Sequence, residues 1–176
     1  AKLNDDIYVT GNLGDSFLEL KILKKKFKIK KNLANYFINK YYKPDIHLNL
    51  SKHLLKFANT SIDISDGLLS DLEKMLNKQN LSFQLNENKI PISKQLTKII
   101  KIKKLKKINF ISNGDDYQIL FTAAPKKARI IKNISKILEI KISKIGKIFS
   151  SKKRSAIIDE KGKQIVLKNK GYIHQF

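Results

Sequence analysis

Apolar residues recur at helical spacing in some stretches of this chain and alternate with polar residues in others. The clearest helix is predicted over residues 66–79, where five apolar residues fall on one stripe: Leu68, Leu69, Leu72, Met75 and Leu76. Weaker patterns of the same kind predict further helices over residues 15–23, 33–42, 50–57, 93–107 and 125–139. The residues that this spacing places on the inward faces of the last three include Leu55, Lys103 and Ile137. Asp15 or Ser16 is the predicted N-cap of the first of these helices.

Strands are predicted where apolar residues lie in short alternating or β-branched runs. These runs cover residues 7–9, 61–64, 83–85, 117–122, 142–149, 156–158 and 164–167. The last two flank the turn Asp159–Gly162 and predict a hairpin. Helices and strands mix without a strict βαβ alternation, so the expected class is α+β, a mixed sheet with packed helices.

Length and composition favour one soluble domain. The chain has 176 residues, of which 41% are hydrophobic and 30% charged, enough to bury a core. It has no cysteine, which excludes disulfides and thiolate metal sites, and no apolar run approaches the roughly 18 residues of a spanning helix. With no signal peptide at its start, a cytoplasmic domain without a membrane partner is expected.

The formal net charge of +22 raises the question of nucleic-acid binding. Only Arg129 and Arg154 are arginines, and base reading depends strongly on the bidentate arginine fork. The lysines come with abundant isoleucine and asparagine, which indicates a compositional bias, so no specific nucleic-acid partner is expected. A non-catalytic module that binds acidic partners or RNA through charge stays open as an alternative.

Acidic residues are the informative minority, and four of the fifteen lie between Asp63 and Glu73. In a strand over residues 61–65, Asp63 and Ser65 point to the same side. Ser65 or Asp66 then reaches the N-terminus of the next helix, where free N–H groups favour phosphate. Carboxylates and phosphate are compatible when Mg²⁺ bridges them, so this pattern is typical of nucleotide-dependent phosphoryl transfer.

A simpler interpretation is that Ser65 and Asp66 only cap the helix, with Asp71 and Glu73 on its solvated face. Asp63 is harder to explain in this way, because it lies between two isoleucines and burying an unpaired carboxylate is costly.

A second acidic pair, Asp115-Asp116, lies in a polar loop and is equally compatible with a plain turn. Two adjacent like charges need a cation, a cluster of donors or open water. The three histidines, His47, His53 and His174, lack ligand spacing and are interpreted as structural or surface residues.

Four segments in this order resemble the thiamine-monophosphate kinase family, of the aminoimidazole ribonucleotide synthetase superfamily. Asp5–Ser16 is similar to the strand and turn that enter the family's C-terminal domain, and Ile62–Leu72 to its central acidic motif. Gly114–Thr122 is similar to its later Gly-Glu-Asp-Tyr-Glu-Leu pattern, and Gly171–Phe176 to its aromatic tail. The resemblance covers essentially the whole chain.

The resemblance implies a kinase that uses ATP and Mg²⁺ to convert thiamine phosphate to thiamine diphosphate, with no covalent enzyme intermediate. It implies that Asp63 and Asp66 hold Mg²⁺ and that Ser65 contacts ATP. It places Asp115 and Tyr172 against the thiamine substrate. No residue is assigned as a general acid or base.

Two departures from the family pattern concern this chain. Asp115 is one methylene shorter than the usual Glu, and Gln118 replaces a usual acid. The family's N-terminal half, which carries most metal ligands and the dimer interface, has no counterpart in residues 1–176.

We therefore expect a single C-terminal domain that is a fragment of a kinase. It is expected to be inactive alone and to form a homodimer only with the missing half. Within the superfamily, another phosphoryl-transfer reaction is the nearest rival.

Overall fold

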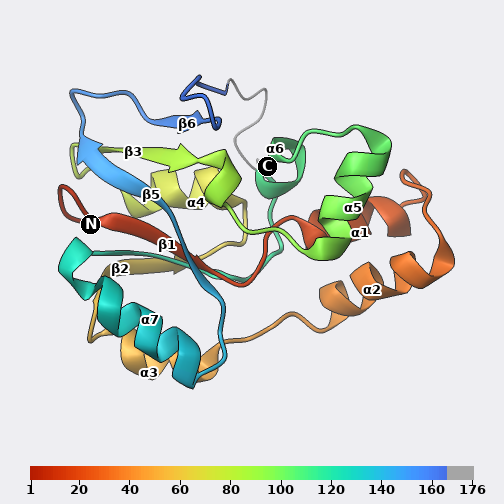
Figure 1. The fold of residues 1–176 in the computed structure, drawn as a ribbon, viewed down its shortest axis with the longest axis horizontal. Helices are drawn as coiled ribbons and strands as arrows, with labels where there is room; N and C mark the ends of the chain where they lie inside the picture. The colour runs from red at the N-terminus through yellow and green to blue at the C-terminus, as the bar shows by residue number, and fades with distance from the viewer. Residues whose placement is uncertain (166–176) are drawn as a thin grey trace.

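The computed structural model describes residues 1–165, apart from the side chain of Tyr41, and contains one mixed six-stranded sheet (Figure 1). The strand order is β2-β4-β1-β5-β3-β6, and only the β3–β6 pair is parallel. The strands are β1 (Asp6–Thr10), β2 (Ala58–Asp63), β3 (Leu81–Asn86), β4 (Ile119–Ala123), β5 (Ile142–Ser150) and β6 (Ala156–Ile158). The predicted α+β class is confirmed.

The helices lie close to where the apolar spacing predicts them. They are α1 (Asp15–Leu23), α2 (Lys31–Tyr42), α3 (Leu48–Leu54), α4 (Leu68–Met75), α5 (Lys94–Lys103), α6 (Ile108–Ile111) and α7 (Ala128–Ile137). Two 3₁₀ turns, η1 (Glu87–Lys89) and η2 (Pro125–Lys127), precede α5 and α7. The short α6 was not predicted, because four residues are too few to show a helical period.

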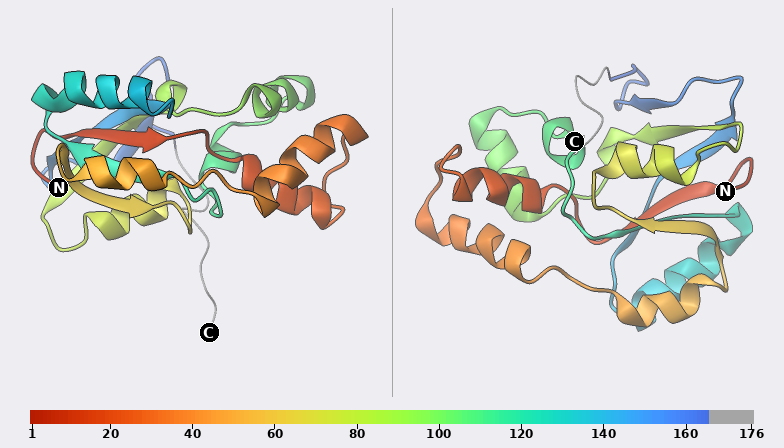
Figure 2. Two further views of the ribbon diagram at one scale, coloured as in Figure 1. Left: turned by 90° about the horizontal axis from the view of Figure 1, so that it is seen from below. Right: turned by 180° about the vertical axis from the view of Figure 1, so that it is seen from behind.

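Side chains alternate across the sheet and divide the core into two layers. Ile7 and Val9 of β1 face the apolar residues of α4, whereas Tyr8 between them faces α3 and α7. All five residues of the predicted α4 stripe are buried. Helix α4 therefore covers one face of the sheet, and α3 and α7 cover the other (Figure 2).

A third apolar cluster lies beside the sheet in what we call the helical lobe, formed by α1, α2, α5 and α6 (Figure 1). Leu18, Phe37, Leu96, Ile99 and Phe110 are its buried residues. Each lobe helix contributes at least one of them, so the lobe has its own small core.

Three residues expected to face inward are exposed. Leu55, predicted on the inward face of its helix, is the C-cap of α3 and is 95% exposed. Ile137 lies at the edge of the α7 stripe and is 76% exposed, and Lys103 of α5 is also exposed.

The predicted C-terminal hairpin is present as far as residue 165, where Ile165 N–H donates to the Ile157 carbonyl at 2.8 Å, and its first strand also has a partner that was not predicted. β6 pairs in parallel with β3, and an antiparallel bridge joins Ile158 to Gln164. The turn is closed by the Asp159 N–H, which donates to the Lys163 carbonyl at 2.9 Å, and by the Lys163 N–H, which donates to the Asp159 side-chain Oδ1 at 2.8 Å. Residues 166 and 167 of the predicted second strand lie outside the described residues. Within residues 1–165, no helix is long and apolar enough to cross a membrane.

Beyond the ends of β2 and β4, the two chains continue side by side. Ile64 N–H donates to the Gln118 carbonyl, Tyr117 N–H to the Ile64 carbonyl, and Asp115 N–H to the Ser65 carbonyl, at 2.8–2.9 Å. Gly114 lies against this crossing, where an added Cβ would come 1.8 Å from the Ser65 carbonyl oxygen. The close approach therefore requires a glycine at this position.

We predict that Gly114→Ala lowers the free energy of unfolding by about 2–4 kcal/mol, because the backbones must separate to admit the methyl group. Gly162→Ala is the matched control: Gly162 has φ +78° but open space around its Cβ position, so only the backbone cost of about 1 kcal/mol is expected. Urea denaturation of both variants measures this difference. Equal losses would contradict the steric account.

Candidate functional site

Three sequence motifs that are far apart in the chain meet at one end of the sheet. The Gly114–Gln118 loop lies between the other two and bonds to both. Asp116 accepts hydrogen bonds from the Gly14 backbone N–H at 2.9 and 3.0 Å, while Asp115 pairs with Ser65. The loop therefore fixes the turn over residues 11–14, which we call the glycine turn, relative to the acidic segment.

The acidic segment turns around the carboxylate of Asp71. One oxygen, Oδ2, accepts hydrogen bonds from three successive N–H groups, those of Ser65, Asp66 and Gly67, at 2.9–3.1 Å. Asp71 is 1% exposed. We call residues 64–67 the acidic turn. The Asp71 carboxylate stabilises the conformation of the acidic turn by accepting these hydrogen bonds, as a bound anion would.

This geometry corrects three expectations about the acidic segment. Neither Ser65 nor Asp66 caps α4, whose N-cap is Gly67 with no side-chain hydrogen bond. Asp71 is buried instead of lying on a solvated face. The N–H groups of residues 65–67, which we expected to face a phosphate, donate to Asp71 instead.

Asp66 itself is paired with a lysine. The ammonium group of Lys74 contacts the Asp66 carboxylate and lies 3.1 Å from Asp71 Oδ1. Its hydrogen bonds to these two carboxylates, Asp66 first, raise the pKa of Lys74. Lys74 thus neutralises part of the negative charge that the acidic turn concentrates.

Asp63 ends β2 and is exposed, so its carboxylate is hydrated and does not carry the burial penalty considered above. Together, Asp63 and Asp66 offer the oxygen ligands that Mg²⁺ prefers. No group of three or more potential ligands that could hold a metal ion occurs in residues 1–165. The donor chemistry therefore fits only part of a magnesium shell.

Asp115 and Asp116 have opposite environments. Asp115 is half-buried and adopts a left-handed backbone with φ 66°. Asp116 is 5% exposed and finds its donors at the start of α1. Of the three arrangements expected for two adjacent carboxylates, the structure shows hydrogen-bond donors at one of them, Asp116.

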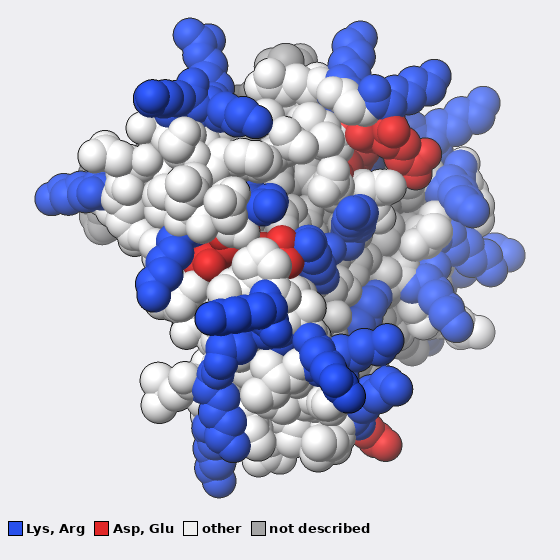
Figure 3. Space-filling view, turned by 60° about the vertical axis from the view of Figure 1, so that its left-hand side comes forward, with Lys and Arg blue, Asp and Glu red and all other residues white. Residues whose placement is uncertain are grey.

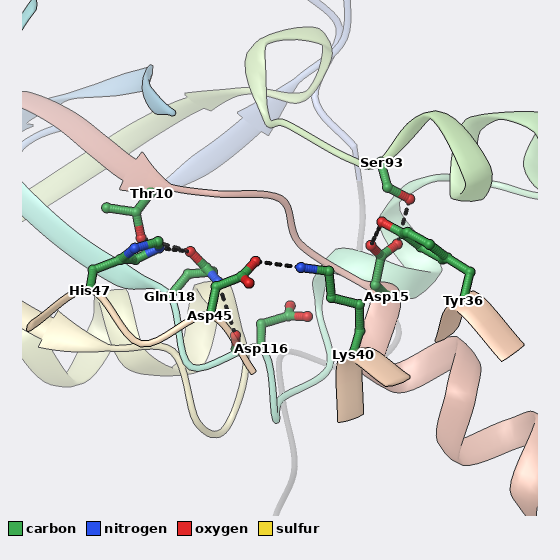
Figure 4. A network of polar contacts seen from close by, with 9 residues as sticks. All are labelled: Thr10, Asp15, Tyr36, Lys40, Asp45, His47, Ser93, Asp116 and Gln118. Carbon is green, nitrogen blue, oxygen red and sulfur yellow. Dashed lines mark hydrogen bonds and ion pairs between the residues drawn. The ribbon is translucent and has the colours of Figure 1, made fainter. Parts of the chain in front are cut away.

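A polar cavity of about 70 Å³ lies beside Asp116, lined also by Asp15, Tyr36, Lys40 and Gln118 (Figure 4). Asp15 is the first residue of α1 and not its cap, which is Gly14. Its buried carboxylate accepts hydrogen bonds from the Ser93 hydroxyl at 2.7 Å and the Tyr36 hydroxyl at 3.2 Å. Asp15 therefore ties the glycine turn to the helical lobe.

Gln118 has a structural environment. Its side-chain oxygen accepts a hydrogen bond from the Thr10 hydroxyl at 2.8 Å and lies 2.9 Å from His47 Nε2 (Figure 4). Thr10 in turn accepts from the backbone N–H of Ile119 at 2.8 Å. Gln118, which replaces the acid usual in the family, is thus a buried amide that joins β1 to β4. Its contact with His47 gives that histidine a structural environment, as expected.

Burial raises the pKa of both carboxyl groups beside the cavity. Desolvation raises the pKa of Asp116 well above its ordinary value, and the Gly14 N–H bond opposes this only in part. Desolvation also raises the pKa of Asp15, opposed by its hydrogen bonds from Ser93 and Tyr36. Ionisation of these groups therefore costs folding free energy.

The structure brings four of the five predicted site residues to the same end of the sheet: Asp63, Ser65, Asp66 and Asp115. The fifth, Tyr172, lies outside the described residues. Sequence reasoning missed the organising roles of Asp71 and Asp116. Their acidic neighbours marked the segments, but nothing in the spacing showed which carboxylate would turn inward.

Removing the Asp71 carboxylate tests its role in the acidic turn. We predict that Asp71→Ala lowers the free energy of unfolding by about 2–3 kcal/mol, because three N–H groups lose their shared acceptor. Glu73→Ala, an exposed position two residues later, removes the same charge and is expected to change stability by less than about 0.5 kcal/mol. Similar losses in both would show that charge, not the turn, is the cause.

A second prediction follows from the raised pKa of Asp15. The folded state holds the proton more tightly than the unfolded chain, whose Asp pKa is about 3.9. Between that value and the raised folded pKa, the free energy of unfolding falls as pH rises, by at most about 1.4 kcal/mol per pH unit for one group. Asp15→Asn should flatten this slope, measured by urea denaturation from pH 4 to 7, whereas the exposed Glu160→Gln should keep it. An unchanged slope in Asp15→Asn contradicts the assignment.

Comparison with known proteins gives the same family as the motifs. Thiamine-monophosphate kinases from two Buchnera aphidicola strains, of the subspecies Schizaphis graminum and Acyrthosiphon pisum, are 39% and 38% identical over 99% of this chain. The alignments cover 54% of each relative, so the chain spans about half the length of the curated relatives it matches. No family model matches the chain.

Solved structures agree in fold. The thiamine-monophosphate kinase of Stenotrophomonas maltophilia matches 94% of this chain and 52% of its own, with a TM-score of 0.78 and 25% identity. The structure described as AaThiL complexed with AMPPCP and TMP matches 98% of this chain and 52% of its own, with a TM-score of 0.76 and 24% identity. The resemblance to the thiamine-monophosphate kinase family is thereby confirmed, over nearly all of this chain and about half of each relative.

Proposed function

We propose that this chain is the C-terminal half of an ATP- and Mg²⁺-dependent kinase that phosphorylates thiamine phosphate to thiamine diphosphate. The observation that carries the proposal is the meeting of the acidic turn with the Gly114–Gln118 loop. It occurs in a chain that is 39% identical to a thiamine-monophosphate kinase over 99% of its length. A structural neighbour described as complexed with AMPPCP and TMP supports ATP and thiamine phosphate as the two substrates.

In this proposal, the acidic turn is the nucleotide side of the site. Asp63 and Asp66 hold Mg²⁺, and the remaining ligands come from phosphate oxygens, water and the half of the enzyme outside this chain. Bound Mg²⁺ would neutralise charge on the transferring phosphoryl group. Ser65, between the two carboxylates, contacts ATP, and its backbone is held by Asp71 and Asp115.

The Gly114–Gln118 loop is the substrate side. Asp115 faces thiamine phosphate together with Tyr172 of the C-terminal tail. Asp116 does not reach the substrate in this proposal; its bonds to Gly14 hold the loop in place. Catalysis then depends on positioning and electrostatics, with no covalent intermediate and no general acid or base from this chain.

A site made of two halves explains the partial donor set. Two carboxylates do not complete a magnesium shell, so this chain alone is expected to be inactive. The complete kinase is expected to form a homodimer through its other half. The cytoplasmic location expected from the cysteine-free sequence is part of the same proposal.

The test is an assay of the protein from the complete reading frame, following ATP-dependent formation of thiamine diphosphate. Asp63→Ala and Asp66→Ala should each reduce turnover at least 100-fold while circular dichroism and the unfolding midpoint stay unchanged, because both lie outside the core. Glu160→Ala, an exposed acid on the β6 turn, is the matched control and should retain full activity.

Full activity in both aspartate variants would contradict the assigned roles. Turnover with another phosphoryl acceptor but none with thiamine phosphate would instead favour a different reaction of the same superfamily. No ATP-dependent turnover with any acceptor would favour a non-catalytic binding module.

A further inference from the structure

The positive charge of this protein is concentrated in the helical lobe. Residues 20–44 and 88–114 contain seventeen lysines and no aspartate, glutamate or arginine. These 52 residues therefore carry +17 of the +22 net charge of the chain. They form α2, α5, α6 and the last four residues of α1, which pack together around the third apolar cluster. Lysines thus occur throughout the sequence, but most of the net positive charge lies in the lobe.

Acidic residues near the lobe offset little of this charge on its surface: Asp45, directly after the first segment, pairs with Lys40 at 2.6 Å. Asp15 and Glu19, at the base of α1, are both buried. On another face of the molecule, basic side chains also project widely, but acidic groups are interspersed among them (Figure 3). The acid-free segments therefore make the lobe strongly cationic.

The lobe also carries an apolar groove. It has a volume of about 780 Å³ and lies between residues 28–33 and α5. Four aliphatic side chains line it: Ile29, Leu33, Ile99 and Ile102. Ile102 is 67% exposed, which is unusual for a large apolar side chain beside a concave surface.

Lysines surround these aliphatic side chains. Lys28 and Lys30 lie on one side of the groove, and Lys98 and Lys103 on α5 lie on the other. No acidic residue lines the groove. The ammonium of Lys103 lies over the Phe27 ring at 5.7 Å, so its stem packs against the lobe while its charge stays at the rim. The groove therefore combines an apolar floor with a rim of positive charge.

We propose that this groove binds an acidic amphipathic helix of a partner protein. A helix with aliphatic residues on one face would place them against Ile29, Leu33 and Ile102, and its carboxylates would meet the lysines on both sides. The proposal does not depend on the kinase function.

Two other kinds of anionic partner fit the groove less well. Its lining contains no aromatic ring on which a nucleic-acid base could stack, and the lobe segments contain no arginine to read base edges. A flat bilayer does not fill a concave groove, and the exposed Ile102 and Leu23 are not interfacial aromatic anchors. Shape and chemistry together favour a protein helix.

The experiment uses a fluorescein-labelled synthetic helix of about 18 residues, built from Glu with Leu at positions i, i+3, i+4 and i+7, titrated with the complete 176-residue chain. Ile102→Asp should weaken binding at least tenfold, and so should the double variant Lys98→Glu/Lys103→Glu. The matched controls are on α7, where Ile137→Asp and Lys132→Glu/Lys136→Glu change exposed residues of the same types. The controls should change affinity less than twofold.

Three results would overturn the proposal. The first is equally tight binding of a scrambled peptide of the same composition, which would leave only non-specific charge. The second is an equal loss of affinity in the groove and α7 variants. The third is tighter binding of single-stranded RNA, or of vesicles of phosphatidylglycerol and phosphatidylcholine, than of the helix, with no effect of Ile102→Asp; this would assign the lobe to that polyanion.

Discussion

The close approach of two backbone segments at Gly114 underlies the arrangement of the candidate site. The Ser65 carbonyl accepts from Asp115 N–H at 2.9 Å, in space that a side chain at position 114 would occupy. This contact extends the β2–β4 pairing past the ends of both strands. It also carries Asp116 to the start of α1, so three segments far apart in sequence become one rigid unit.

Carboxylates stabilise this unit from inside. Asp71 gathers three N–H groups of the acidic turn, and Asp116 accepts the Gly14 N–H across more than a hundred residues of sequence. Buried acids of this kind serve as backbone acceptors. The acids that remain accessible, Asp63 and Asp66, are those proposed to meet Mg²⁺ and nucleotide. Asp71 and Asp116 thus stabilise the backbone of the site, whereas Asp63 and Asp66 are the carboxylates proposed to bind ligands.

Much of the fold could be predicted from periodicity, because the α4 stripe and the alternation in β1 reflect burial directly. The site was predicted in part: the acidic segments were identified, but not the inward turn of Asp71, since hydrogen bonds between distant backbone groups leave no periodic signal. The pairing of β6 with β3 was missed for the same reason. Helix N-caps were also predicted from residue type at Asp15 and Ser65, yet glycines occupy both caps. The Gly14 N–H donates to Asp116 of a neighbouring loop, and the Gly67 N–H donates to Asp71 of α4 itself.

The most direct test of the account is an amide NMR titration of the ¹⁵N-labelled chain with AMPPCP, in the presence and absence of Mg²⁺. The account predicts Mg²⁺-dependent shift changes concentrated in residues 63–67 and 114–118, absent in Asp66→Ala. Changes confined to the lysine-rich helical lobe, independent of Mg²⁺, would contradict it and show that the nucleotide is bound only through charge.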